Sequence, residues 1–458
     1  MIAGVPRRVH VVGIGGGAMS GIARILHAEG HHVTGSDERS TEVTQALEAL
    51  GIEVALGQRA GNVGDAQLVV TTSAASADNP ELVEANARVI PVMKRDAMLA
   101  KLMENKYSIA VAGTHGKTTT SSLMAHILAY AGRDPSFLVG GDVLTLGTNA
   151  RPGTGPHMVV EADEFDRAFL AYHPDIAIVT NIEADHLDIY GTVEEVAKAF
   201  GQFMTQATPS GYVITCADND LLVRTAASVK IAATHETYGI ERDATWRATN
   251  IRRCERGQSF DIVRDGEPYG AFSTSLVGGY NVANASACIA ASAALGLSAE
   301  ETREALQAFR GAHRRFELLG EVNGITFMDD YAHHPTEVRT TMAAAKEHFA
   351  GRRLVAIFQP HTFYRNEYLL DEWRTCFASV DVLYLLETVG GRYEPSAGLT
   401  SADLAREVTS PKATYVATID EAVDTIAPAL REGDVFFTVG SYNDQVGPAL
   451  LKRLRGGA

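Results

Sequence analysis

Residues 110–120 read AVAGTHGKTTT: an apolar run, a turn with two glycines, and a Gly-Lys-Thr triplet. Apolar residues then recur at helical spacing as far as Leu128, so the sequence predicts a strand, a turn and a helix. Glycines allow backbone N–H groups to approach phosphate oxygens, and the start of a helix adds partial positive charge. We therefore interpret this stretch as a site that binds the phosphates of a nucleotide.

Single residues of this turn can be given roles. Lys117 can reach the terminal phosphates, and the Thr118 hydroxyl can bind Mg²⁺. The generic P-loop has a longer spacer before its Gly-Lys pair, since only Thr114 and His115 follow the first glycine here. A plain glycine turn with a surface lysine is disfavoured by the strand–helix setting. The residues predicted to bind ATP in this stretch are Gly113, Thr114, His115, Gly116, Lys117, Thr118 and Thr119.

The composition limits the class of protein. A length of 458 residues predicts roughly three domains, and 46% hydrophobic with 21% charged residues is typical of a globular α/β chain. The net charge of −16 argues against nucleic acid or an anionic membrane as a partner. We see no apolar run long enough to insert in a membrane. The four cysteines form no C-x-x-C pair, which predicts reduced thiols and a cytoplasmic location.

A second glycine turn lies near the N-terminus. An apolar stretch, residues 9–12, is followed by GIGGGA at 13–18, which fits the Gly-x-Gly-x-x-Ala fingerprint of dinucleotide-binding folds. Asp37 follows the next predicted strand, near the usual place of a ribose-binding acid, and Ser73 follows a later one. The turn indicates a diphosphate-containing ligand without identifying a nicotinamide. A turn that serves only helix–strand packing remains the alternative.

Two acidic segments follow predicted strands after the P-loop. They read EADEFD at 161–166 and NIEADHLD at 181–188. In a parallel sheet both would lie at the edge that carries the phosphate loop, where oxygen ligands suit Mg²⁺. Acidic clusters are more often solvated surfaces, and His186 is a less usual ligand that could equally be a loop histidine. We nevertheless predict metal binding here.

The rest of the chain predicts a small β layer and then another α/β segment. Residues 245–277 alternate in short stretches typical of antiparallel hairpins, and an Ala-rich helix follows that carries Asn281 and Asn284 on one face. These asparagines could bind a ligand or cap the helix. From residue 313 onward, polar residues again follow predicted strands. Adjacent histidines at 333–334 point apart, which disfavours a metal pair.

Taken in this order, these signals resemble the Mur ligase family, ATP-dependent amide-bond-forming enzymes of bacterial cell-wall synthesis. The resemblance covers nearly the whole chain. The motifs that carry it are GIGG (13–16), MSG (19–21), SD (36–37), GTHGKT (113–118), EADE (161–164), NIEADH (181–186), YN-x-x-N (280–284), RRFE (314–317) and DDYAHHPT (329–336).

The resemblance implies an α/β fold of three domains. Residues 1–100 would form a Rossmann-like domain that binds a UDP-sugar. Residues 101–312 would form a P-loop ATPase domain with a parallel sheet and a small antiparallel layer. Residues 313–458 would form a second Rossmann-like domain that closes on ATP and the amino acid.

The resemblance also implies residue roles. Lys117 would bind the β/γ-phosphates, Thr118 and Glu161 one Mg²⁺, and His186 a second. The ATP-binding set would further include Asn281 and Asn284 near the adenine, with Arg315 and Asp330. The UDP-sugar would contact Gly13, Gly15, Gly16, Asp37 and Ser73, and the amino acid would lie near His361 and Arg365. The catalytic set would be Lys117, His186, Asp330 and His333.

The implied reaction joins L-alanine to the carboxylate of UDP-N-acetylmuramate, with ATP and Mg²⁺, through an acyl phosphate. Three alternatives stay open: a recycling ligase that joins a murein peptide to the same UDP-sugar, a nicotinamide-dependent dehydrogenase, and a non-enzymatic nucleotide switch. The oligomeric state is also open. Three places depart from the family pattern: Phe165 replaces a common serine, Thr362 an arginine of some members, and residues 440–444 a glycine-rich turn.

Overall fold

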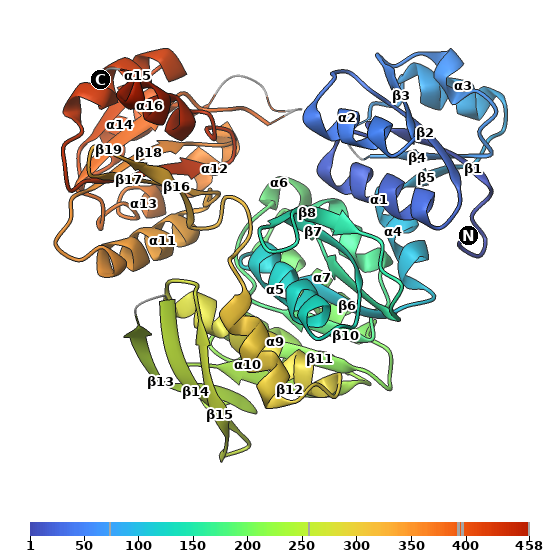
Figure 1. Ribbon diagram of the computed structural model, residues 1–458, viewed down its shortest axis with the longest axis horizontal. Coiled ribbons are helices and arrows are strands. Elements are labelled where there is room, and N and C mark those ends of the chain that lie inside the picture. The colour runs from blue at the N-terminus through green and yellow to red at the C-terminus, as the bar shows by residue number, and fades with distance from the viewer. Residues whose placement is uncertain (73–74, 255–256, 392–393, 395–397, 457–458) are drawn as a thin grey trace. The chain divides into compact units, whose positions relative to one another are not determined.

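The computed structural model describes residues 1–72, 75–254, 257–391, 394 and 398–456. Ser73, predicted to contact a UDP-sugar, lies outside the described residues. Within them the strands form three sheets (Figure 1). The chain divides into two compact units, which are described separately. Unit 1 comprises residues 1–252, 259–274 and 283–310, and unit 2 comprises residues 253–258, 275–282 and 311–458.

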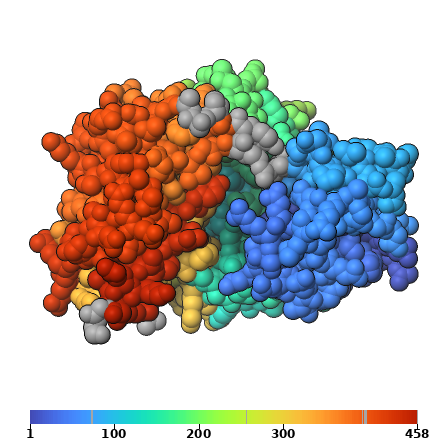
Figure 2. Space-filling view, turned by 90° about the horizontal axis from the view of Figure 1, so that it is seen from above, coloured from blue at the N-terminus to red at the C-terminus, as the bar shows by residue number. Residues whose placement is uncertain are grey.

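The N-terminal sheet of unit 1 has the order β3-β2-β1-β4-β5, and all of its strand pairs are parallel. Its first hundred residues, blue in Figure 2, form a closely packed body. The strand order reverses at β1, where folds of this kind bind their ligands. The elements are β1 (Arg8–Val12), α1 (Gly17–Ala28), β2 (His32–Asp37), α2 (Glu42–Ala49), β3 (Glu53–Leu56), η1 (Ala60–Val63), β4 (Leu68–Thr71), α3 (Pro80–Ala87), β5 (Val92–Lys94) and α4 (Arg95–Met103).

The central sheet has the order β15-β14-β13-β12-β11-β10-β6-β9-β7-β8. Its middle strands are parallel, and β8 pairs antiparallel with β7. The stretch predicted as a small β layer forms β13 to β15 at one end of this sheet. The strands are β6 (Tyr107–Ala112), β7 (Ser136–Val143), β8 (Thr148–Arg151), β9 (His157–Glu161), β10 (Ile176–Val179), β11 (Tyr212–Cys216), β12 (Thr234–Gly239), β13 (Trp246–Cys254), β14 (Gly257–Arg264) and β15 (Glu267–Thr274).

Helix α5 (Lys117–Tyr130) begins directly after the P-loop and packs against β7 and β9. Most of its residues are buried, including the hydroxyl residues of its first half as well as the apolar residues of its second half. The remaining helices of this region are η2 (Phe165–Ala171), α6 (Leu187–Tyr190), α7 (Val193–Thr205), α8 (Asp220–Ser228), α9 (Gly279–Ala294) and α10 (Ala299–Ala308).

The sheet of unit 2 has the order β16-β17-β21-β18-β19-β20. In the described part of the chain, β16 pairs antiparallel with β17, and the other strand pairs are parallel. Adjacent residues of β17 pack on opposite faces of the sheet. Met328 packs with α11, α13 and α14, and Phe327 packs with α15 and α16. The elements are β16 (Glu317–Val322), β17 (Ile325–Asp330), α11 (Pro335–His348), β18 (Leu354–Gln359), α12 (Phe363–Tyr368), α13 (Leu370–Trp373), β19 (Val382–Leu386), α14 (Ser401–Glu407), β20 (Ala413–Val416), α15 (Ile419–Ile426), η3 (Ala427–Ala429), β21 (Val435–Gly440) and α16 (Val446–Arg455).

The α/β fold predicted from the sequence is thus confirmed. None of the helices in the described part of the chain has the length and apolar character needed to cross a membrane. The limits 1–100, 101–312 and 313–458 stay predictions, since unit 1 holds both the N-terminal and the central sheet.

Candidate active site

The P-loop lies at the carboxyl end of β6, pressed against the end of β10. Gly113 has φ +139°, and a Cβ on it would lie 1.9 Å from the Thr180 Oγ1. The Thr114 amide donates to the Asn181 carbonyl oxygen at 3.1 Å, and the His115 amide to the Asn181 Oδ1 at 2.8 Å. Asn181 therefore holds the turn from the neighbouring strand. Sequence reasoning placed Asn181 in a motif but gave it no role, although its position after a parallel strand could have signalled one.

Lys117, the first residue of α5, points back into the turn. Its Nζ donates to the Gly113 carbonyl oxygen at 2.6 Å and forms a 2.8 Å ion pair with the buried Glu164. Burial lowers the pKa of Lys117, but the carboxylates of Glu164, Asp163 and Glu161 raise it more, so the net shift is upward. Lys117 is therefore cationic at neutral pH. A cation held at a glycine turn is suited to bind phosphate oxygens.

Two predicted metal ligands converge at one point beside the P-loop. A Cβ on Gly140 of β7 would lie 2.4 Å from the Glu161 Oε2 and 2.6 Å from the Thr118 Oγ1. The Gly140 amide also donates to the Glu161 Oε2 at 2.7 Å. Only glycine fits this close to these oxygens, and two oxygen donors that converge here suit a hard cation such as Mg²⁺.

His186 lies in the loop after β10, directly before α6. Its ring contacts the edge of Phe165, with centroids 5.3 Å apart, and its Nε2 is 3.8 Å from the Asp185 Oδ2. Phe165, which replaces the common serine, is thus a neighbour of the predicted metal-binding histidine. The backbone carbonyl of Glu164 accepts a 2.6 Å hydrogen bond from the Tyr190 hydroxyl and so fixes the same loop.

The two asparagines of α9 lie at its start. A Cβ on Gly116 would lie 2.8 Å from the Asn284 Oδ1, so Asn284 faces the P-loop. In unit 2, the Asn281 Nδ2 donates to the Val277 carbonyl oxygen at 2.7 Å. This contact is not an N-cap, because an N-cap side chain accepts from a first-turn amide. Of the two asparagines, Asn284 is the one whose side chain lies beside the P-loop within unit 1.

The first glycine turn joins β1 to α1 and is held by the end of β2. The amides of Gly13 and Ile14 both donate to the Ser36 carbonyl oxygen at 2.9 Å. The Gly15 amide donates to the Asp37 Oδ2, also at 2.9 Å. Asp37 thus supports the turn itself, a contact that the ribose-binding interpretation did not include. The structure brings together the described residues of the predicted UDP-sugar set, which are Gly13, Gly15, Gly16 and Asp37.

In unit 2, Asp330 ends β17. Its carboxylate accepts hydrogen bonds from the amides of Phe316 and Ala332, at 2.8 and 2.9 Å. Burial raises its pKa to about 6, against the attraction of Arg315 and these amides. The guanidinium of Arg315 lies 4.9 Å above the ring of Tyr331. Asp330 and Arg315 are therefore brought close together at the end of this strand.

The predicted amino-acid side lies at the ends of two neighbouring strands of unit 2. The ring of His361 contacts Tyr442 at 4.8 Å between centroids, and the Arg365 Nη1 donates to the His361 carbonyl oxygen at 3.3 Å. Near Asp330, the His333 ring lies 5.4 Å from that of Tyr331. Tyr442 belongs to the turn that departs from the family pattern, and it was not predicted as a site residue.

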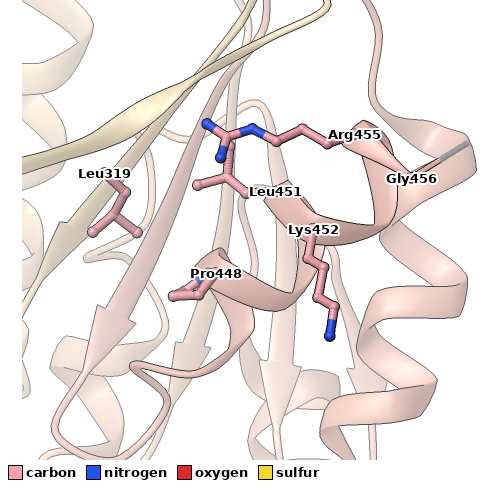
Figure 3. A pocket seen from close by; sticks show the side chains of 6 residues that line it. All are labelled: Leu319, Pro448, Leu451, Lys452, Arg455 and Gly456. Atoms are coloured by element: carbon pink, nitrogen blue, oxygen red, sulfur yellow. The ribbon is translucent and has the colours of Figure 1, made fainter. Parts of the chain in front are cut away.

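A cavity of about 530 Å³ lies elsewhere in unit 2, between β16 and α16 (Figure 3). None of the predicted site residues lines it. Its lining residues are Leu319, Pro448, Leu451, Lys452, Arg455 and Gly456.

Family models match three consecutive parts of the chain. Residues 8–107 match the model described as Mur ligase family, catalytic domain, residues 111–292 the Mur ligase middle domain, and residues 314–442 the Mur ligase, glutamate ligase domain. The chain belongs to the Mur ligase family. The resemblance seen in the sequence motifs is thereby confirmed, and the two glycine turns fall in separate modules of the family.

Relatives match over nearly the full length. The UDP-N-acetylmuramate–L-alanine ligase of Geobacter sp. (strain M21) is 44% identical over 98% of both chains. That of Anaeromyxobacter sp. (strain Fw109-5) is 43% identical over 97% of both. Among solved structures, the UDP-N-acetylmuramate–alanine ligase of Thermotoga maritima aligns with a TM-score of 0.84 at 29% identity, covering 98% of this chain and 100% of that one. A murein peptide ligase from Psychrobacter arcticus 273-4 gives 0.74 at 27% identity, with 98% and 99% covered.

Proposed function

We propose that this Mur ligase is an ATP-dependent enzyme that joins L-alanine to the carboxylate of UDP-N-acetylmuramate in peptidoglycan precursor synthesis. The observation that carries the proposal is the 44% identity, over 98% of both chains, to a ligase named for this reaction. The P-loop with its partly buried Lys117 supports it, because the reaction requires a site for the phosphates of ATP. The glycine turn of the N-terminal sheet supports a second, diphosphate-containing substrate.

The chemistry follows from the poor reactivity of a carboxylate. Transfer of the γ-phosphoryl group of ATP to the carboxylate gives ADP and an acyl phosphate, which has a good leaving group. The L-alanine amine attacks the acyl carbon, and collapse of the tetrahedral intermediate releases phosphate. Such transfers depend chiefly on positioning and on stabilisation of developing negative charge. Lys117 is suited to this role, because its charge is held at the turn where the phosphates would bind.

The remaining assignments form part of the proposal. Thr118 and Glu161 would hold Mg²⁺, and the convergence of their oxygens beside Gly140 supports this. When bound, the cation would neutralise phosphate charge during transfer. His186 would approach a second cation, and Asn281, Asn284, Arg315 and Asp330 would approach the nucleotide. His333, His361 and Arg365 would serve the acyl and amine side, in a three-domain chain with limits near residues 100 and 312.

The alternative function is that of a peptide-recycling ligase, because the chain is also structurally similar to a murein peptide ligase. ADP release by the purified protein, with UDP-N-acetylmuramate and each amine supplied in turn, separates the two. We expect turnover that requires both the UDP-sugar and free L-alanine. Turnover with a murein tripeptide but not with L-alanine would assign the recycling reaction. Absence of turnover with every amine, with ATP binding intact, would refute both.

A further inference from the structure

A buried carboxylate lies behind the first glycine turn. Glu81, in the first turn of α3, has no exposed surface. Its Oε2 accepts a 2.6 Å hydrogen bond from the Ser36 hydroxyl, and its Oε1 accepts one of 2.6 Å from the Asn62 Nδ2. The Arg59 amide donates to the Oε1 at 3.3 Å, and the His10 Nε2 lies 3.4 Å from the Oε2. Three segments, β1, β2 and η1 with its N-cap, therefore direct four polar groups at one carboxylate.

This carboxylate is ionised. Burial raises the pKa of Glu81, but the nearby His10 ring and the hydrogen bonds from Ser36 and Asn62 lower it more, so that the net shift is downward. A buried charge is costly unless such partners are fixed in place, and losing one of them exposes the full desolvation penalty. The buried charge of Glu81 therefore stabilises the positions of the groups that donate to it.

Ser36 links this network to the glycine turn. Its side chain binds Glu81, while its carbonyl oxygen accepts from the amides of Gly13 and Ile14. The next residue, Asp37, accepts from the Gly15 amide. The Gly16 amide donates to the Gly13 carbonyl oxygen at 3.1 Å. The backbone amides of the turn therefore donate their hydrogen bonds within the protein. A diphosphate would instead bind at the N-terminus of α1, which follows the turn.

We propose that Glu81 and Ser36 are positioning residues for the UDP-sugar: through Ser36, the buried carboxylate fixes the glycine turn and thereby the start of α1. The inference rests on the proposed function, because the UDP-sugar is assigned to this turn. Neither side chain needs to touch the ligand. A purely structural network would affect stability, whereas a positioning network affects the binding of one substrate.

The decisive variant is Ser36→Ala, which removes the link and leaves the carboxylate in place. We expect KM for UDP-N-acetylmuramate to rise about tenfold, as for loss of a hydrogen bond to a charged group. The values of kcat and of KM for ATP and L-alanine should stay within twofold of wild type. Glu81→Gln keeps the size of the side chain and one acceptor oxygen, so a smaller rise in the same KM is expected.

His31→Ala is the matched control in the same sheet. His31 is also buried, and its ring forms hydrogen bonds of 2.9 Å with the Ile2 amide and with the Pro6 carbonyl oxygen. These contacts lie at the N-terminal ends of β1 and β2, whereas the glycine turn lies at their carboxyl ends. This variant should lower Tm and leave KM for the UDP-sugar unchanged. The inference is wrong if Ser36→Ala lowers Tm like the control without a selective change in that KM.

A binding measurement separates this failure from failure of the proposed function. Calorimetric titration with UDP-N-acetylmuramate should give about tenfold weaker binding to Ser36→Ala than to wild type. If wild type shows no turnover yet this difference is found, the assigned reaction fails and the positioning role stands. If wild type turns over and both proteins bind the UDP-sugar equally, the reaction stands and the positioning role fails.

Discussion

The two glycine turns of unit 1 share the order strand, turn and helix, but they differ in the charged groups around them. Each follows a central strand of its sheet, β1 or β6, and each leads into a helix, α1 or α5. The first turn is held by the end of β2, whose Asp37 accepts an amide and whose Ser36 is bonded to a buried carboxylate. The second is held by Asn181 at the end of β10 and contains a cation, Lys117.

The difference lies in what the neighbouring strand supplies. An acid at the end of β2 occupies the amide of its turn, so that turn is a rigid support without a cation. Asn181 at the end of β10 fixes the backbone of the P-loop, and Glu183, two residues further on, lies 3.3 Å from the ring nitrogen of His115. The two turns thus differ in the group that bonds their backbone amides, a carboxylate in one and a side-chain amide in the other, and in the lysine that the second carries.

The largest expected effect is that of Lys117→Ala. Removing the only cation of the second turn's Gly-Lys-Thr triplet should lower kcat about a thousandfold or more, because charge that develops on the phosphoryl group loses its partner. ADP release in the presence of all three substrates measures it. Lys101→Ala is the control. It removes a lysine of α4 that forms an ion pair with Glu104, and it should keep near-wild-type activity. Residual activity above a tenth of wild type would contradict the role given to Lys117.

The next effect compares a glycine of each turn. Alanine at Gly113 would bring its Cβ to 1.9 Å from the Thr180 Oγ1 and 3.0 Å from the Thr180 amide nitrogen, so the turn must shift. Among the described residues, alanine at Gly13, with φ +71°, meets the Thr72 Cγ2 alone, at 3.4 Å, and suffers about 1 kcal/mol of backbone strain. We expect Gly113→Ala to weaken ATP binding at least about a hundredfold, by the overpacking of a rigid site.

Gly13→Ala should lower Tm by a few degrees and change ATP binding little. Fluorescence titration with an ATP analogue and thermal unfolding of both variants provide the comparison. Equal losses of ATP affinity would show that the two turns are not independent.

How far the sequence predicts these sites depends on the range of the interactions. The strands, the turns and Lys117 follow from local patterns, and the α/β fold and the family are confirmed. The partners Ser36–Glu81 and Asn181–His115 join residues 45 and 66 positions apart, which no local pattern reveals. Glu81 looks like an ordinary first-turn acid of a helix, and only its burial sets it apart. The roles assigned to single site residues stay predictions.

A moderate effect is expected at the proposed cation site beside the P-loop. A Cβ in Gly140→Ala would lie within 2.6 Å of oxygens of Glu161 and Thr118 and would displace them. The Mg²⁺ concentration for half-maximal activity should therefore rise at least about tenfold, since a small cation tolerates little change in ligand geometry. Gly147→Ala, whose Cβ meets no described atom within 4 Å, is the control for adding a methyl group away from the site, although its φ of +70° adds a strain that Gly140→Ala does not have. An unchanged Mg²⁺ requirement in Gly140→Ala would remove Thr118 and Glu161 from the proposed site.

The smallest effect concerns the acid that supports the first turn. Because its hydrogen bonds lower the pKa of Glu81 in the folded state, the folded protein binds fewer protons there than the unfolded chain. The stabilisation is therefore complete above the ordinary carboxyl pKa and is lost as the pH falls through the folded-state value. The difference in Tm between wild type and Glu81→Gln should accordingly be largest near neutral pH and shrink below about pH 4.5. A difference that stays constant across a pH series would mean that an uncharged hydrogen-bond acceptor suffices, and the contrast between an acid-supported and an amide-supported turn would lose its electrostatic basis.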